Sequence, residues 1–286
     1  PHLSKRLRPS SLLMIKKLLP YAIIIFHASN IQAAEWTLDG RVNQEMAYDD
    51  NIRMQSGEDK RSSFIYEFLP QLNAGYKSGA TQLTANVGYG VEVYSNKLET
   101  VRQKVNASVG GSYQTQSVNY GLNVSYNLQP ARNTAADDTG NFNSDAARTS
   151  WSISPTIAYT LTEQDTLNAS VQYSQSLYSK DDNATISDSL ADNDNIGFNL
   201  GWAHRWSEQY TTTLSGAANF YQSDGDVRKT NNKNYSFTLG NSCQFNERWN
   251  VIFDAGYRYT DSENTLAGFA FNNTSQGFLI NTALNY

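Results

Sequence analysis

The sequence predicts an all-β protein, a closed up-and-down antiparallel transmembrane β-barrel of about 12 strands. Apolar and polar side chains alternate with a period of two through most of the chain, which is typical of strands with two different faces. Short and long connectors follow one another in turn, and aromatic residues gather at the strand ends. No stretch carries a helical period with start and stop signals.

The N-terminal region has the layout of a secretory signal peptide. A basic segment, Met14–Lys17, precedes the apolar run Leu18–Phe26, and Ala33 offers a small residue for cleavage. The apolar run is shorter than the roughly 20 residues of a membrane-spanning helix. We expect residues 1–13 to be an upstream extension, 14–33 a signal peptide and 34–286 the barrel domain. A genuine basic arm at 1–13 is the alternative.

The charge of the mature chain argues against nucleic acid as a partner. Five of the 22 basic residues precede Ala34 and none of the 27 acidic ones does, which leaves a net charge of −10. Nucleic-acid binding requires a basic face. Cys243 is the single cysteine, so no internal disulfide forms. A hydrophobic content of 39% suits a barrel, in which only every second strand residue needs to be apolar.

The predicted strands each carry one apolar face. They are Trp36–Tyr48, Phe64–Tyr76, Leu83–Val93, Val105–Tyr113, Val118–Leu128, Trp151–Leu161, Leu167–Leu177, Ile196–Trp206, Leu214–Phe220, Tyr235–Phe245, Trp249–Tyr259 and Ser275–Tyr286. The chain stops on the last of these. Because an open strand edge recruits other chains, and because a bilayer offers no water to satisfy it, we expect this strand to pair with the first and close the barrel.

The connectors differ in length according to the end of the barrel. Those after the even-numbered strands are tight: Lys77–Ala80, Gln114–Ser117, Thr162–Asp165, Ser207–Gln209 and Asn246–Arg248. Those after the odd-numbered strands are mostly long: Asp49–Arg61, Gln129–Arg148, Ser179–Asp192, Gln222–Asn234 and Asp261–Thr274, with Ser95–Thr100 the short exception. Short periplasmic turns and long outer loops are typical of outer-membrane barrels, so the sequence predicts a bacterial outer-membrane location.

Aromatic residues flank both sets of connectors and predict two interfacial girdles. Beside the tight turns lie Tyr76, Tyr113, Tyr159, Trp206, Tyr210, Phe245, Trp249 and Tyr286. Beside the long loops lie Tyr48, Phe64, Tyr94, Trp151, Tyr178, Phe220, Tyr235 and Tyr259.

The last strand resembles the C-terminal recognition strand of bacterial outer-membrane proteins, with a terminal aromatic residue and apolar residues at every second position before it. The resemblance implies an assembly signal formed by Phe278, Ile280, Leu284 and Tyr286, read by the barrel-assembly machinery. More narrowly, the segment Tyr48–Ile52 resembles porin-like barrels encoded beside exopolysaccharide and exosortase genes. That resemblance implies polysaccharide-export components as partners and no catalytic residues.

The face opposite the apolar stripe is expected to line the lumen. It is rich in Ser, Thr, Asn, Gln and Gly, which suits a hydrated path for small polar solutes, and acids and bases on it are equal in number. The candidate charged lumen-lining residues are Arg41, Glu45, Glu67, Glu92, Arg102, Lys104, Arg205, Asp254 and Arg258, and Asp39 on the same face makes the count five acids and five bases. Opposite signs should largely cancel, which predicts weak ion selectivity.

No phosphate loop, zinc pattern or Gly-x-Ser-x-Gly elbow occurs, so we expect no enzyme activity and no cofactor. The expected surroundings are outer-membrane lipid and lipopolysaccharide. The acidic outer loops could bind lipopolysaccharide phosphates through bridging calcium, and ordinary solvated loops are the alternative. The leading function is a porin-like or export-associated channel. The alternatives are an outer-membrane hydrolase, a plugged structural barrel and a secreted soluble β-protein. His204, the one histidine of the mature chain, is expected to lie in the periplasmic girdle rather than in a catalytic site.

Overall fold

A computed structural model describes residues 34–52, 57, 60–95, 102–134, 146–179, 190–225, 228–246, 248–266 and 268–285. The signal-peptide region and Tyr286 therefore lie outside the described residues. The strands are β1 (Glu35–Asp49), β2 (Ser63–Ser78), β3 (Thr81–Tyr94), β4 (Arg102–Gln114), β5 (Val118–Pro130), β6 (Ala147–Thr160), β7 (Asp165–Tyr178), β8 (Asp192–Arg205), β9 (Tyr210–Asp224), β10 (Arg228–Gln244), β11 (Asn250–Leu266) and β12 (Phe269–Asn285). A short 3₁₀ helix, η3 (Ala131–Thr134), follows β5.

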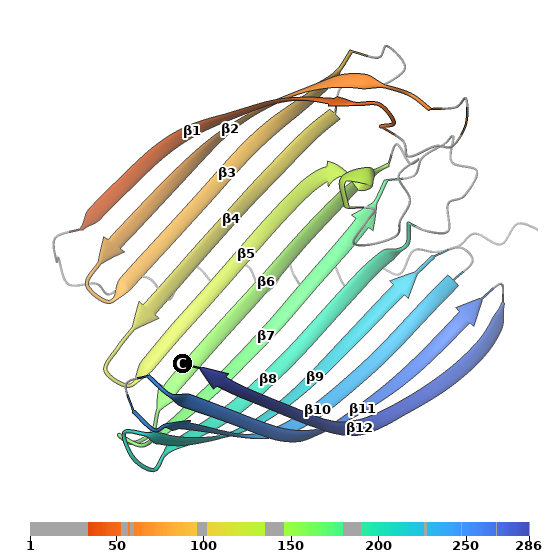
Figure 1. Cartoon of the computed structure of the whole chain (residues 1–286). Coiled ribbons are helices and arrows are strands. Elements are labelled where there is room, and N and C mark those ends of the chain that lie inside the picture. The colour runs from red at the N-terminus through yellow and green to blue at the C-terminus, as the bar shows by residue number, and fades with distance from the viewer. Residues whose placement is uncertain are drawn as a thin grey trace, which may run out of the picture.

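The predicted all-β, up-and-down architecture is confirmed. All 12 strands form one sheet in sequence order, and each strand pairs antiparallel with its chain neighbours. The sheet curls strongly on itself, with β1 and β12 as its two edges (Figure 1). These edge strands do not pair with each other in the described structure, so the expected closure is not observed. Among the described residues, no helix is long and apolar enough to cross a membrane.

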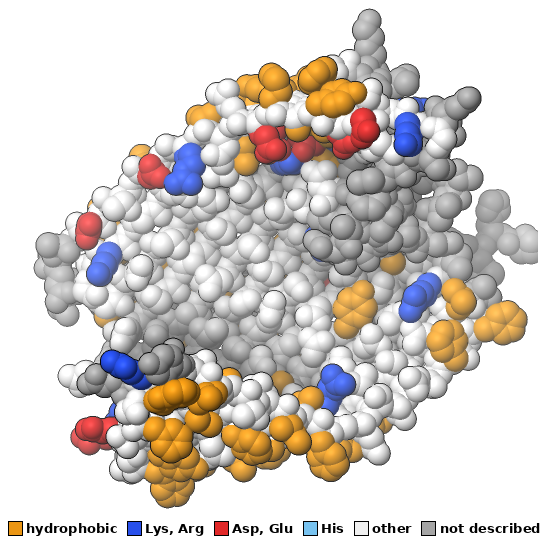
Figure 2. Space-filling view, in the orientation of Figure 1, with side chains coloured by type: hydrophobic (Ala, Val, Ile, Leu, Met, Phe, Trp, Pro, Cys, Tyr) orange, Lys and Arg blue, Asp and Glu red, His pale blue; other side chains and the backbone are white. Residues whose placement is uncertain are grey.

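The sheet has two different faces. Large apolar side chains such as Leu38, Phe237 and Ile280 lie exposed on the convex face, whereas the hollow is almost free of them (Figure 2). Only four hydrophobic residues are buried in the described part of the chain: Ile52, Tyr94, Ala131 and Ala146. A protein that is stable in water would bury such side chains in a core. The fold therefore fits a surrounding apolar solvent better than an aqueous one.

Two of the predicted outer loops are wrong. Gln222–Asn234 and Asp261–Thr274 were expected as loops because they are polar, but the ladders of β9 to β12 continue through most of both segments. Ladder hydrogen bonds join backbone groups and do not require apolar side chains. Cross-strand polar pairs support these extensions: Lys229–Asp224 at 2.6 Å and Lys233–Glu263 at 3.3 Å.

The tight turns are confirmed and have clear local causes. Gly79 adopts a φ of 50°, a conformation that other residues rarely take, between β2 and β3. At the β4–β5 turn, the Thr115 hydroxyl accepts a hydrogen bond from the Val118 amide at 2.9 Å. At the β6–β7 turn, the Thr162 hydroxyl accepts one from the Asp165 amide at 3.0 Å. Side chains that bond the local backbone in this way favour turns over further extension.

Most of the predicted girdle residues lie on the convex face. Near the tight-turn end, the girdle residue Tyr76 contacts Trp36, which was not assigned to a girdle, with ring centroids 4.6 Å apart. Near the loop end, Tyr235 contacts Phe220 at 5.8 Å and Tyr259 at 6.4 Å. Tyr94 and Tyr178 were assigned to the outer girdle wrongly. Each sits on the polar parity of its strand, together with Glu92 and Ser176 respectively, and so belongs to the concave face.

Candidate functional site

Neutral polar side chains cover most of the concave wall and bond to one another across strands. The pairs span the sheet from β2 to β11: Asn86 with Asn73, Ser125 with Ser152 at 2.8 Å, Asn199 with Ser170 at 3.3 Å, Asn219 with Asn195 at 2.8 Å, and Thr260 with Asn234 at 2.8 Å. Each amide or hydroxyl keeps further donor or acceptor capacity for water or solute. The predicted neutral lining therefore exists as a continuous surface.

A charged cluster lies on the concave face near the outer ends of β2, β3 and β4. We call Glu67, Glu92, Arg102 and Lys104 the outer-end charge cluster. The Lys104 ammonium lies 2.6 Å from the Glu67 carboxylate and also pairs with Glu92. The Glu92 side chain is only 7% exposed, and that of Lys104 is 22% exposed. Arg102, which is buried, stands directly opposite Glu92 in the β3–β4 register.

The strand register separates acids from bases around this cluster. Glu45, Glu67 and Glu92 face one another in a row across β1, β2 and β3. The bases follow on β4, as Arg102 and Lys104. Like charges directly opposite on neighbouring strands destabilise a sheet, so the Lys104 ammonium between two of these carboxylates has a clear stabilising role. At this end of the wall the acids therefore lie on β1 to β3 and the bases on the next strand, β4, where Lys104 pairs with two of the carboxylates.

Three residues of this region were missed in the sequence. Tyr94 donates its hydroxyl to the second oxygen of Glu92 at 2.8 Å. Asn133, in η3, donates to Glu92 at 3.4 Å, so the start of the β5–β6 connection lies against the concave wall. Arg148 bonds Ser176 at 3.1 Å from the concave face of β6. Strand parity identifies Tyr94 and Arg148 as concave, whereas no local pattern predicts the contact of Asn133.

The other predicted lumen residues do not join the cluster. Arg41 and Glu45 lie exposed on the edge strand β1. Arg205 lies at the tight-turn end of β8 and donates to the Glu163 carbonyl at 2.7 Å. Arg258 stands exposed near the middle of β11, opposite Ser236 and Gly277.

The side chain of Asp254 occupies space that is left free because the facing residue is a glycine. Its carboxylate accepts a hydrogen bond from Asn281 at 3.0 Å. Gly240 stands opposite on β10, and a Cβ atom there would lie 2.5 Å from the other carboxylate oxygen. Any larger residue at this position would force Asp254 to move.

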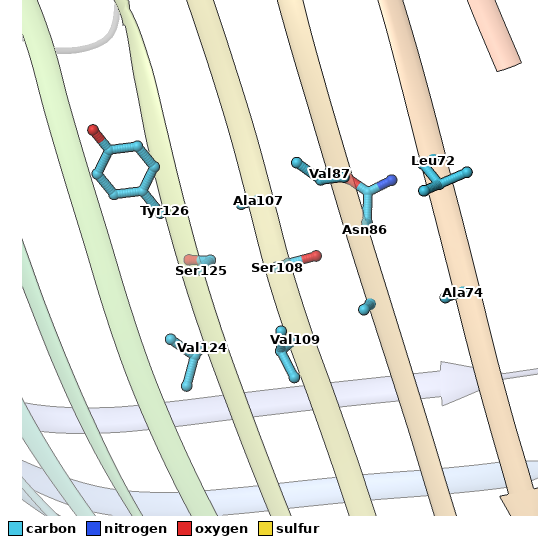
Figure 3. A pocket seen from close by; sticks show the side chains of 11 residues that line it. Leu72, Ala74, Asn86, Val87, Ala107, Ser108, Val109, Val124, Ser125 and Tyr126 are labelled. Atoms are coloured by element: carbon cyan, nitrogen blue, oxygen red, sulfur yellow. The ribbon is translucent and has the colours of Figure 1, made fainter. Parts of the chain in front are cut away.

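A shallow apolar depression crosses β2 to β5 on the convex face. Small side chains such as Ala74 and Ala107 lie between Leu72 on one side and Tyr126 on the other (Figure 3), and Ala85 also lines the depression. It lies on the opposite side of the sheet from the polar lining.

His204 lies on the convex face at the tight-turn end, as the parity of Trp202 predicts. Its Nδ1 is 2.7 Å from the Asp165 carboxylate, a partner that the sequence pattern alone does not indicate. Among the described residues, no serine or cysteine hydrogen-bonds this histidine.

No protein-family model and no curated protein matches the chain. Among solved structures, it is similar to an outer membrane channel from Pseudomonas putida F1 at 12% identity, covering 90% of this chain and 96% of that one, with a TM-score of 0.39. It is also similar to a deltaS2 mutant of the TodX monoaromatic hydrocarbon channel, at 14% identity, 87% and 81% coverage and a TM-score of 0.34. A mutant porin of Rh. blastica gives 8% identity, 86% and 100% coverage and a TM-score of 0.23. Because all three TM-scores are low, the function proposed below rests on the residues of this chain.

Proposed function

We propose that the chain forms a closed bacterial outer-membrane barrel that passes small uncharged polar solutes. The observation that carries the proposal is the two-faced wall, with exposed apolar side chains outside and bonded asparagine, serine and threonine side chains inside. Twelve strands about 4.8 Å apart and tilted by about 40° close into a barrel of roughly 24 Å backbone diameter. Side chains narrow this opening to the size of a small hydrated solute.

Liposome swelling tests the proposed passage. Vesicles that contain the purified protein should swell in a pentose faster than in a tetrasaccharide of equal osmolarity, because the narrowed opening passes a small hydrated solute more readily than a large one. Lipid-only vesicles are the control. Equal rates with and without the protein would contradict the channel proposal.

A plugged structural barrel is the second candidate, and one observation favours it. Ala131, at the start of η3, is only 1% exposed, and Asn133 touches Glu92, so η3 covers part of the inner wall. Complete absence of single-channel conductance in planar bilayers would select this candidate over an open channel.

A matched pair of arginine substitutions tests the assignment of the two faces. Leu239 lies on the convex face midway along β10, and its neighbour Thr238 lies on the concave face. Leu239→Arg should lower the free energy of unfolding in bilayers by about 2–4 kcal/mol, whereas an arginine in the lumen remains hydrated. Thr238→Arg should therefore lower the free energy of unfolding much less than Leu239→Arg does. Denaturant titration in vesicles measures both, and equal costs would refute the assignment.

A further inference from the structure

A histidine–carboxylate pair is built into the convex face where β7 and β8 meet their tight turns. Asp165 Oδ1 lies 2.7 Å from His204 Nδ1 and accepts a hydrogen bond from Trp202 Nε1 at 3.0 Å. Its Oδ2 accepts one from the Thr162 hydroxyl at 2.7 Å. Since an ionised carboxylate only accepts hydrogen bonds, Nδ1 of the imidazole must carry a proton. Three donors therefore fix Asp165, and Asp165 fixes the orientation of His204.

Two indole rings frame the imidazole. The ring centroid of His204 lies 5.7 Å from that of Trp202 and 4.3 Å from that of Trp206, which stands nearly perpendicular to it. Trp206 is held by a hydrogen bond from its Nε1 to the Thr212 hydroxyl at 3.0 Å, yet 60% of the residue is exposed. Within the described part of the chain, Nε2 of His204 has no protein partner. It is the one ring nitrogen left for an external group.

The surroundings of this pair favour a cation over an anion. Asp165 supplies a negative charge on the convex face. Arg205, next to His204, belongs to the other face of β8 and is bonded to the Glu163 carbonyl. Indole faces attract ammonium groups, and the lone pair of a neutral imidazole accepts a hydrogen bond from one. A group with both a positive charge and N–H donors satisfies all three features.

We propose that His204, Asp165 and Trp206 bind the primary ammonium of an ethanolamine phospholipid in the periplasmic leaflet. The placement rests on the outer-membrane barrel of the proposed function and on the orientation expected from the connector lengths, with the tight turns on the periplasmic side. Aromatic side chains such as Trp206, Tyr210 and Phe245 gather at this end of the sheet, where headgroups would lie. Ethanolamine offers three N–H donors and a positive charge. Choline keeps the charge without the donors, and a glycerol headgroup lacks the charge.

Native mass spectrometry of the full chain tests this site. The protein is released from bilayers containing equal amounts of ethanolamine, choline and glycerol phospholipids with identical acyl chains. We expect ethanolamine lipid to be retained about tenfold over choline lipid, as one charge-assisted hydrogen bond implies. His204→Phe keeps an aromatic ring but removes Nε2, and should abolish this preference. Tyr113→Phe, elsewhere in the same girdle, should leave it unchanged.

The outcomes separate the site from the channel. Equal retention of the three lipids by the native chain, or an unchanged preference in His204→Phe, would overturn the proposal. Heat-modifiable migration on a gel checks that each variant folds. If His204→Phe misfolds, Trp206→Leu provides a second variant, which should lower the retention of both ethanolamine and choline lipids relative to glycerol lipid. A chain that retains ethanolamine lipid but does not permit vesicle swelling would refute the channel and support the lipid site.

Discussion

Replacing Lys104 by glutamine is expected to make the channel cation-selective and less stable. The substitution leaves Glu67 and Glu92 opposite each other without the shared ammonium that lies between them. A unit charge about 10 Å from a passing ion in water changes its energy by about 0.4 kcal/mol. This favours a cation about twofold and disfavours an anion equally, so the cation-to-anion permeability ratio should rise about fourfold.

The same substitution should lower the free energy of unfolding by about 2 kcal/mol. The value lies below that for a fully buried pair because Lys104 keeps some exposure to solvent. Reversal potentials in a salt gradient measure the selectivity, and denaturant titration in vesicles measures the stability. Lys229→Gln is the matched control, since Lys229 pairs with Asp224 at the exposed loop end of the sheet. An unchanged reversal potential in a folded Lys104→Gln barrel would show that the outer-end charge cluster lies off the ion path.

A compensating change separates charge from packing in this cluster. Glu67→Gln combined with Lys104→Gln restores the balance of charge, leaving Glu92 opposite Arg102. The double variant should recover most of the stability and most of the original selectivity. Recovery of neither would mean that Lys104 acts through packing of its alkyl chain rather than through its charge.

Strand number, pairing order and facing could be predicted from the sequence because each depends on local alternation. The position of Leu239 beside Thr238, for example, already assigns one to each face. The ends of β9 to β12 could not be predicted from the sequence, because polar residues such as Asn231, Asp261 and Glu263 are typical of loops. Their extended conformation depends on the partner strand, which a local pattern does not show.

For the outer-end charge cluster, the sequence predicted which face of the sheet each residue occupies but not which residues contact one another. Parity places Glu67, Glu92 and Lys104 on the concave wall, but their meeting depends on the register between strands. Register shifts of two residues preserve parity while changing every neighbour. For the same reason, parity alone could place His204 in the girdle but could not pair it with Asp165.

The registers between neighbouring strands also predict how the two open edges meet when the barrel closes. Asp39 on β1 begins a row of directly opposite residues that crosses all 12 strands and ends at Asn273, near the loop end of β12. When strands tilted by about 40° close into a barrel of 12, a row of opposite residues returns to the first strand displaced along it. The displacement is about 48 Å, or about 14 residues. Asn273 should then stand opposite a position just beyond the outer end of β1. A shift in the opposite direction would leave no residue of β1 opposite a residue of β12, so the two strands could not pair.

This geometry places Tyr48 opposite Phe278 and Val42 opposite Leu284, with all four side chains on the convex face. We expect disulfide formation in Tyr48→Cys/Phe278→Cys and in Val42→Cys/Leu284→Cys, both made in a Cys243→Ser background because Cys243 is a free thiol. Directly opposite residues of an antiparallel pair are close enough for a disulfide. Gel mobility after oxidation of the membrane-inserted protein detects the cross-link, and the urea-unfolded chain is the control.

Pairs shifted by two residues measure the register itself. Val42→Cys/Thr282→Cys corresponds to a smaller displacement and Tyr48→Cys/Ile280→Cys to a larger one, and both should cross-link much less than the predicted pairs. A dominant shifted pair would correct the tilt while keeping the barrel closed. Cross-links between molecules, with none within a molecule, would mean that β1 and β12 pair with a second copy of the chain. Because an unpaired edge in a bilayer leaves a row of backbone groups without hydrogen bonds, at a cost of several kcal/mol each, one of these pairings must form for the protein to reside in a membrane.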